Sequence, residues 1–353
     1  MQLQIVCLVL AWLIGNHDML FQQPNDIVIE QRIFLLELLS NGAIIYLKDK
    51  EIDSGNIDEN NVTAIIEEIQ TLNVDDVIGL VINNSAIQEE HLLLLSQLKN
   101  LHDLSFINCE IDDQKAKLLS EFEVLHELTL CEEEITGECF ATFAKMKSLK
   151  IINLVNNPNI ECAYWKDIFT SQIPWIYIAE CPLTDEVLIS LPRNKSLRTI
   201  GLVAINGITD AVVHFFNRCP NLIDINISEN PQISGRIFEQ LRYPQYIESL
   251  ALNDLDITDE HIKNITRFRN LRVIFLNNTK ITNKSAQILF EKWNLFVCET
   301  VNTNITENGK TLMELRFAFD SKEELEGYYD RIGVKKPASL LKNEESNSQT
   351  DQN

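Results

Sequence analysis

The chain has 353 residues, of which 45% are hydrophobic, so it is long enough to bury a large core and to form two or three domains. Asp and Glu number 52 against 30 Lys and Arg, and the net charge of −22 argues against binding to nucleic acid or to an anionic membrane surface, because both need clustered cations. The 11 glycines and 9 prolines are too few for a fibrous chain, and the 8 cysteines lack the CxxC pairs of zinc ribbons and redox motifs.

Residues 1–24 contain an apolar stretch, Leu3 to Gly15, that is interrupted only by Gln4. A helix of this length spans about 20 Å, less than the roughly 30 Å hydrocarbon core, and suits the apolar region of a secretory signal. However, no Lys or Arg precedes Arg32, and no clean small-x-small cleavage site follows the stretch. Three interpretations stay open: an export signal or signal-anchor, the end of a longer anchor, and a buried cap helix. The first two place the rest of the chain outside the cytoplasm.

Residues 25–76 are predicted to form an N-terminal cap. An apolar segment at 27–39, preceded by Asn and Asp and followed by Asn-Gly, predicts a helix. A short aliphatic run at 44–47 predicts a first strand, and 62–72 predicts a second helix. Together they resemble an enlarged first repeat of the array that follows.

From residue 77 to residue 305 one arrangement of residues recurs in nine clear copies and one degenerate copy. The first copy reads Val77-x-x-Leu80-x-Ile82-x-x-Ser85-x-Ile87. The central aliphatic residue returns every 24 or 25 residues, at positions 80, 104, 128, 152, 176, 200, 225, 250 and 274. Internal periodicity of this kind is the signature of a repeat architecture.

Each copy predicts a strand, a turn and a helix. Aliphatics two residues apart, such as Leu80 and Ile82, lie on one face of a strand. A Thr followed by acidic residues, as in Thr258-Asp259-Glu260, is typical of a helix start. Because one such unit cannot bury its apolar face alone, the copies are predicted to stack.

The copies resemble the leucine-rich repeat family, whose LxxLxLxxN/CxL pattern they match within its range of repeat lengths. Their Ile-Thr-Asp turns are similar to the cysteine-containing, ribonuclease-inhibitor-like branch and to repeats of bacterial exported or membrane-anchored proteins. The resemblance implies an α/β solenoid: a curved horseshoe with a parallel concave β-sheet and convex helices. The chain departs from the pattern where Glu133, Ile205 and Leu255 replace a small polar residue, which predicts an interrupted side-chain ladder in those copies.

After the array, residues 306–342 are predicted to form a C-terminal cap. Ser321-Lys322-Glu323-Glu324 has the spacing of a capping box at the start of a short helix. Residues 343–353 are polar and contain no aliphatic residue, which predicts a disordered tail.

Two local patterns resemble ligand-binding sites, but each lacks a residue that such a site needs. Gly309-Lys310-Thr311 matches the end of a phosphate-binding loop, but Asn304 stands where that loop needs glycine. His102 and His126 occupy the same slot in adjacent copies, so they are predicted to lie about 5 Å apart. Two exposed histidines explain them better than a metal pair, because no third ligand shares the slot.

The cysteines offer one pair in neighbouring copies, Cys139 and Cys162. Export permits a disulfide between them, although buried free thiols are the simpler expectation. No Gly-x-Ser-x-Gly or His-Glu-x-x-His motif is present. The sequence therefore predicts no enzymatic activity, no cofactor and no metal.

The residues that alternate with the buried strand aliphatics are predicted to face outward on the sheet and to bind a ligand. Trp175 and Tyr177 are the expected anchors, because large aromatic side chains dominate protein interfaces. The other apolar members of this face are Ile107, Cys131, Ile151, Val155 and Val203, and its acidic members are Glu127, Glu132 and Glu180. A surface of this composition and length predicts a protein or peptide partner that carries basic residues.

The alternative function is an intracellular adaptor, such as a substrate receptor of a ubiquitin ligase, whose repeats are also similar. Such receptors carry an N-terminal docking motif that opens with Leu-Pro-x-Glu, and residues 25–45 show no such motif. The expected location is therefore extracytoplasmic or membrane-anchored, with a cytoplasmic location as the alternative.

Overall fold

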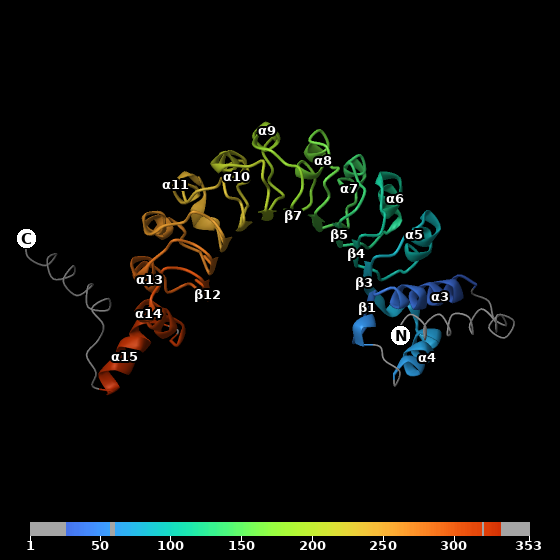
Figure 1. The fold of residues 1–353 in the computed structure, drawn as a ribbon, viewed down its shortest axis with the longest axis horizontal. Coiled ribbons are helices and arrows are strands. Elements are labelled where there is room, and N and C mark those ends of the chain that lie inside the picture. Colours follow the sequence, from blue (N-terminus) through green and yellow to red (C-terminus); the bar gives the residue numbers. More distant parts are fainter. Residues whose placement is uncertain (1–25, 57–60, 320, 333–353) are drawn as a thin grey trace, which may run out of the picture. The chain divides into compact units, whose positions relative to one another are not determined.

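The computed structural model describes residues 26–56, 61–319 and 321–332 (Figure 1). The chain forms two compact units, which meet in sequence between Gly207 and Ile208. The predicted signal or anchor segment, residues 1–24, and the predicted disordered tail, residues 343–353, lie outside the described residues. A search of the described helices for one of sufficient length and hydropathy to cross a membrane finds none.

The first unit contains an N-terminal cap followed by repeats. Its cap elements are α3 (Asp26–Ser40), β1 (Ile44–Leu47), β2 (Glu51–Asp53), η1 (Ser54–Asn56), α4 (Val62–Thr71) and η2 (Val74–Asp76). Its repeat strands are β3 (Val77–Asn83), β4 (Asp103–Ile107), β5 (Glu127–Cys131), β6 (Ile151–Val155), β7 (Trp175–Ala179) and β8 (Thr199–Val203). The short helices between them are α5 (Glu89–Leu95), α6 (Asp113–Lys117), η3 (Leu118–Glu121), α7 (Phe140–Phe143), α8 (Trp165–Phe169) and α9 (Asp185–Ser190).

Strands β3 to β8 pair in parallel and in the register of the sequence repeat. Leu104 pairs with Leu128, and Ile152 pairs with Ile176, so residues 24 positions apart lie side by side. The inward aliphatics are fully buried, and Ile176 and Ile178 are both 0% exposed. The solenoid predicted from the repeat spacing is confirmed: one strand layer, one helix layer, and a continuous apolar core between them.

The N-terminal cap differs from the enlarged first repeat that its strand suggested. Strand β1 runs antiparallel to β3, with Ile45 opposite Leu80, and β2 pairs antiparallel with β1. The sharp reversal at Lys48–Lys50 joins β1 and β2, so the cap contains an antiparallel hairpin instead of a repeat. The hairpin covers the edge of β3, which would otherwise present unpaired backbone groups.

Large aromatic side chains fill the space under the helices of the first unit. Trp165 is 0% exposed, and its ring centroid lies 5.4 Å from that of Phe140 and 6.2 Å from that of Phe169. Its indole N–H donates to the Pro182 carbonyl oxygen at 2.7 Å, so the one polar atom of the side chain is satisfied.

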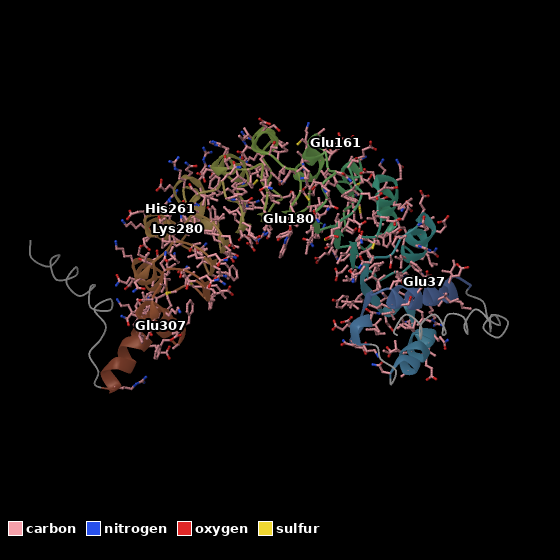
Figure 2. The ribbon with its side chains drawn as sticks, in the orientation of Figure 1. Glu37, Glu161, Glu180, His261, Lys280 and Glu307 are labelled. Atoms are coloured by element: carbon pink, nitrogen blue, oxygen red, sulfur yellow. The ribbon has the colours of Figure 1, made fainter. Side chains whose placement is uncertain are left out.

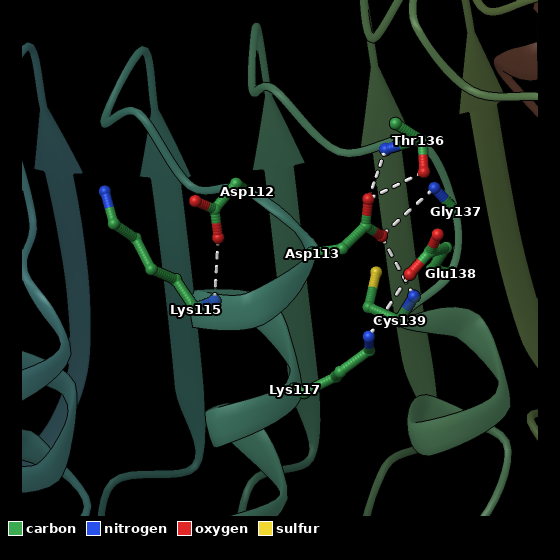
Figure 3. A network of polar contacts seen from close by, with 8 residues as sticks. All are labelled: Asp112, Asp113, Lys115, Lys117, Thr136, Gly137, Glu138 and Cys139. Atoms are coloured by element: carbon green, nitrogen blue, oxygen red, sulfur yellow. Dashed lines mark hydrogen bonds and ion pairs between the residues drawn. The ribbon is translucent and has the colours of Figure 1, made fainter.

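Aspartates connect successive repeats at the starts of the helices (Figure 3). Asp113 is buried, and its carboxylate accepts hydrogen bonds from the backbone N–H groups of Thr136, Gly137 and Cys139 and from the Thr136 hydroxyl. These bonds hold the pKa of Asp113 below its usual value despite burial, which acts in the opposite direction. The sequence predicted acidic residues that stabilise their own helix; instead, Asp113 anchors the start of the next one.

Glu133 completes the buried side-chain ladder that it was expected to interrupt. The residue is 2% exposed, and its carboxylate accepts from the Cys109 N–H at 2.9 Å and from the Ile111 N–H at 2.8 Å. Its own N–H donates to the amide oxygen of Asn157, whose amide group donates to the Leu130 carbonyl. The longer side chain spans the distance, so the ladder continues through this copy.

The second unit repeats the arrangement with shorter strands. Its helices are η4 (Asp210–Val212), α10 (Val213–Phe216), α11 (Ile237–Gln240), η5 (Pro244–Tyr246), α12 (Asp259–Ile262), η6 (Lys263–Arg267), α13 (Asn283–Phe290), α14 (Glu307–Phe317) and α15 (Lys322–Ile332). Its parallel strands are β9 (Asp224–Asn226), β10 (Ser249–Ala251), β11 (Val273–Phe275) and β12 (Val297–Glu299). At the chain's end, Leu325 of α15 is buried against Phe290 of α13, and the Ser321 hydroxyl accepts from the Glu324 N–H at 3.1 Å.

Candidate functional site

The outward face of strands β4 to β8 carries three rows of side chains, one from each alternate strand position. Residues 24 positions apart are neighbours in a row, because the strands pair in that register. The first row is Asp103, Glu127, Ile151, Trp175 and Thr199. The second row is Ser105, Thr129, Asn153, Tyr177 and Gly201. The third row is Ile107, Cys131, Val155, Ala179 and Val203.

Trp175 is the most exposed apolar side chain of this face. Its exposed fraction is 42%, and its strand neighbours are Ile151 on one side and Thr199 on the other. Ile107, Ile151 and Val155 are half-buried. The predicted apolar centre is therefore assembled around an indole ring that stands open to solvent.

Tyr177 lies flat against the neighbouring strand instead of projecting away from the sheet. A methyl group placed on Gly201, its strand partner, would lie only 2.3 Å from the Tyr177 Cδ2 atom. The ring therefore occupies the space that a larger side chain at 201 would fill, and Tyr177 is half-buried. Such aromatic cover of a strand glycine holds the ring in a fixed orientation.

Val203 does not belong to the accessible surface that was predicted for it. It points to the outward side of β8, but only 8% of its surface is exposed. It pairs with Ala179 of β7, which is also buried. Val203 therefore offers little surface to a ligand.

The three predicted glutamates have different surroundings. Glu127 is half-buried, and its carboxylate accepts from the Asn153 amide at 3.0 Å, so part of its hydrogen-bonding capacity is used within the sheet. Glu132 and Glu180 are exposed just past the ends of β5 and β7. Figure 2 shows Glu180 beside the strand layer, where it faces away from the helices.

Glu132 and Glu180 both adopt a backbone conformation that glutamate disfavours. Their φ angles are +57° and +52°, in the left-handed region. Asn84, Asn108 and Asn156 occupy the same position in other repeats, and asparagine tolerates this conformation better. Each strained residue donates its N–H to the next strand, Glu132 to the Val155 carbonyl at 3.0 Å and Glu180 to the Val203 carbonyl at 3.1 Å.

The sequence predicts which residues face outward, but it does not reveal the roles of Asn153 and Gly201. Asn153 matters because it ties down Glu127 and also donates to the Thr129 hydroxyl at 3.0 Å. Gly201 matters because it makes room for Tyr177. The signal for Gly201 was a glycine inside a strand motif, which often marks the close approach of another group.

The other sequence patterns have structural explanations. His102 and His126 lie in adjacent repeats as predicted, with ring centroids 5.5 Å apart. Within the described residues, no cluster of three or more His, Cys, Asp or Glu side chains is arranged to hold a metal ion. Cys139 and Cys162 are both free thiols, the first buried and the second exposed, so the disulfide that export would permit is not formed.

Gly309 lies inside α14 instead of in a phosphate-binding loop. A methyl group on Gly309 would lie 2.4 Å from the Asn283 side-chain oxygen, so the glycine permits close packing of α14 on α13. The ammonium group of Lys310 pairs with Glu307 one turn earlier, at 2.7 Å.

Comparisons with known proteins find matches among solved structures only. No protein-family model and no curated protein matches the chain. The solved structures that resemble it include an internalin (inlF) from Listeria monocytogenes, with a TM-score of 0.40 and 14% identity, over 70% of this chain and 89% of that one. They also include TLR13 in its complex with ssRNA13, with a TM-score of 0.43 and 16% identity, over 63% of this chain and 35% of that one.

The assignment of the fold comes from the chain's own geometry. The LxxLxL positions are buried, the strands pair at a spacing of 24 residues, and each strand is followed by a turn and a short helix. The chain therefore has the fold of a leucine-rich repeat solenoid.

Proposed function

We propose that the outward face of β4 to β8 binds a protein or peptide partner without catalysing a reaction. The observation that carries the proposal is the exposed Trp175 ring, held beside Ile151 and flanked at the strand ends by Glu132 and Glu180. Repeat solenoids offer extended surfaces of this kind to macromolecules. An open aromatic side chain with apolar neighbours and charged residues at the rim is the composition of a binding hot spot.

The exposed carboxylates of Glu132 and Glu180 also support a role in binding. Both residues share the left-handed backbone conformation of this turn with Asn108 and Asn156 in neighbouring repeats and with Ala204 after β8. The conformation therefore belongs to the repeat, whereas within the first unit the negative charge belongs to these two positions. Two exposed carboxylates beside the outward face favour attraction of a basic ligand.

The test compares capture of proteins by three forms of the intact chain. The Trp175→Ala/Tyr177→Ala variant removes both aromatic rings from the face. The control, Ile189→Ala, removes an apolar side chain of similar exposure from α9 in the helix layer, where Ile189 is 39% exposed. Proteins retained by the wild-type chain and by the control are expected to be lost from the double variant, with circular dichroism spectra unchanged in all three.

The decisive measurement is the affinity of a retained protein for each form. Truncation of a hot-spot aromatic costs 2 kcal/mol or more, so a loss of at least about thirtyfold is expected for the double variant. Equal affinities for the double variant and the wild-type chain would show that the ligand binds elsewhere.

The proposal extends to repeat subtype and location. It assigns the repeats to the cysteine-containing, ribonuclease-inhibitor-like type, and it places the partner outside the cytoplasm or at a membrane surface. The support is the 24-residue spacing with its Ile-Thr-Asp turns and the apolar segment at residues 3–15. Fractionation of cells tests the location, and recovery of the chain in the cytosol with Met1 intact would favour the intracellular adaptor instead.

A further inference from the structure

The two ends of the parallel strands in the first unit carry opposite charge. The segments that follow the carboxyl ends of β4 to β7, up to the first residues of the next helices, span residues 108–113, 132–138, 156–161 and 180–186. These segments contain 11 acidic residues and no Lys or Arg. Two lysines of α6 contact them: the Lys115 ammonium donates to the Glu110 carbonyl, and Lys117 pairs with Glu138 at 3.4 Å. Asp113 and Glu133 are buried within this set, while Glu132 and Glu180 are exposed next to the outward face.

The loops that enter the amino ends of β4 to β8 have the reverse composition. They span residues 96–102, 120–126, 144–150, 168–174 and 192–198, and they contain 7 Lys or Arg against 2 Glu. The cations nearest the face are Lys150 and Arg198, which directly precede the first residues of β6 and β8. Both side chains are exposed, and neither forms an ion pair with the described part of the chain.

Lys150 and Arg198 belong to one row across the sheet, together with His102 and His126. The Lys150 N–H donates to the His126 carbonyl, and the His126 N–H donates to the His102 carbonyl, so these residues continue the strand register. This row, with His102, His126, Lys150 and Arg198, is the amino strip. Glu132 and Glu180, at the other strand ends, form the carboxyl strip.

The two strips are far enough apart to act independently. Glu132 lies six positions after His126, at the other end of β5, which corresponds to about 20 Å of extended chain. The Debye length at physiological ionic strength is about 8 Å, so the strips neither neutralise nor screen one another. A partner lying along β6 to β8 therefore meets positive charge at one end, the Trp175 ring next to it, and the negative charge of Glu180 at the other end. The first residues of β4 and β5, Asp103 and Glu127, are acidic, so the positive end is confined to β6 to β8.

We propose that the partner presents an apolar segment flanked by acidic groups on one side and basic groups on the other, and that the two strips fix its orientation. This inference rests on the proposed function. It changes the expected ligand from a basic one to one that carries both acidic and basic groups. Charge complementarity of this kind selects one docking orientation, because rotation by 180° would bring like charges together. The second unit lacks the pattern, since Lys280 lies in a carboxyl-side loop and Lys284 lies in the first turn of the helix that follows it.

The test uses three synthetic peptides with one shared aromatic and aliphatic core. The first has lysines on both flanks, the second has glutamates on both flanks, and the third has glutamates on one flank and lysines on the other. Binding to the intact chain is measured by fluorescence anisotropy at 150 mM NaCl. The peptide of mixed sign is expected to bind the wild-type chain about tenfold more tightly than either of the others.

Reversal of the charge of the amino strip distinguishes a ligand of mixed charge from a purely basic one. Lys150→Glu/Arg198→Glu is expected to weaken the mixed-sign peptide about tenfold and to strengthen the all-lysine peptide. The control, Lys166→Glu/Lys284→Glu, makes the same change of net charge at exposed helix positions and is expected to leave all three affinities unchanged. Glu132→Asn/Glu180→Asn relieves backbone strain, so its expected loss of affinity for lysine-bearing peptides has no origin in misfolding.

Three outcomes would overturn the inference. The first is tightest binding of the all-lysine peptide with no loss in Lys150→Glu/Arg198→Glu, the second is an equal effect of the control, and the third is no binding of any peptide at millimolar concentration. Trp175→Ala/Tyr177→Ala identifies which proposal has failed. If that variant weakens the all-lysine peptide while the amino strip has no effect, the binding face stands and only the two-signed ligand is wrong.

Discussion

Glu133 shows how a single buried carboxylate couples this fold to pH. Its two backbone N–H donors stabilise the charged form, but removal from water has the larger effect and raises the pKa of Glu133 to about 7. The thiol of Cys109, which contacts the same turn, responds to burial in the same direction, with its pKa raised to about 11. Cys109 therefore stays protonated, and its sulfur lies 3.2 Å from the Ile82 carbonyl oxygen that it can donate to.

The raised pKa predicts that Glu133 makes the protein less stable as the pH rises. Between its ordinary pKa of 4.5 and the folded value of about 7, the folded chain holds a proton that the unfolded chain releases. This contribution is fully present below pH 4.5 and is lost as the pH rises through 7. Relative to Glu133→Gln, the wild-type chain is expected to lose about 3 kcal/mol of unfolding free energy between pH 4.5 and pH 8.

Urea denaturation of both proteins at several pH values measures this difference. Glu134→Gln is the matched control, because Glu134 is adjacent and exposed. A parallel pH dependence of the wild-type and Glu133→Gln proteins would contradict the expectation.

At the scale of the element, three short helices depend on an aspartate of the repeat before them. Asp113 holds the start of α7, Asp210 accepts from the Ser234 N–H and hydroxyl at 2.7 Å, and Asp259 accepts from Thr282 and Ser285 at the start of α13. Helices of four to eight residues are too short to be stable alone. These hydrogen bonds stabilise the helix starts, where backbone N–H groups have no partner within the helix.

Asp113→Asn is expected to destabilise the protein by about 1–3 kcal/mol at neutral pH. The asparagine amide keeps one acceptor oxygen, but its NH2 group replaces the other oxygen and faces backbone N–H groups, which are donors too. The pKa of Asp113 is lowered in the folded chain, so its stabilisation is present above pH 3.8 and is lost as the pH falls through the folded value. The cost of the substitution is therefore expected to vanish in acid.

Asp112→Asn is the matched control in thermal unfolding of the intact chain. Asp112 caps its own helix through the Lys115 N–H at 2.9 Å, and asparagine is an equally good cap. An equal loss of stability in both variants would mean that the Asp113 contact between repeats contributes no more to stability than the cap that Asp112 forms on its own helix.

At the scale of the whole molecule, the repeat is the unit that the sequence encodes. Periodicity predicted every strand from β3 to β12, because aliphatic residues must face one core. It did not predict that β1 runs antiparallel to β3, because a run of four aliphatic residues specifies a strand and not its direction. Nor did it predict that Val203 is buried on the outward side of β8, since alternation does not specify exposure. Alternation assigns a side to each residue, whereas exposure depends on neighbours far away in sequence.

Nearest-neighbour stacking predicts that one complete repeat can be removed. Deletion of residues 108–131 joins Ile107 to Glu132, which occupies the position of Asn108 in the next repeat. The shortened chain is expected to keep its circular dichroism spectrum and to unfold cooperatively at a lower temperature. Deletion of 108–119 breaks the register and is expected to abolish cooperative unfolding. Similar behaviour of the two deletions would contradict stacking in a fixed register.

The aspartate contacts between repeats also have a direction that matters during synthesis. Asp113, Asp210 and Asp259 each precede the residues that they bind by about one repeat, so a chain that has grown just past one of these three aspartates carries a carboxylate whose donors are not yet made. The helix that supplies those donors therefore forms next to an acceptor that is already present. Proteolytic removal of repeats is therefore expected to affect stability differently from the two sides. Removal from the C-terminal side leaves an aspartate carboxylate that water can hydrate. Removal from the N-terminal side leaves a helix start without its hydrogen-bond acceptor.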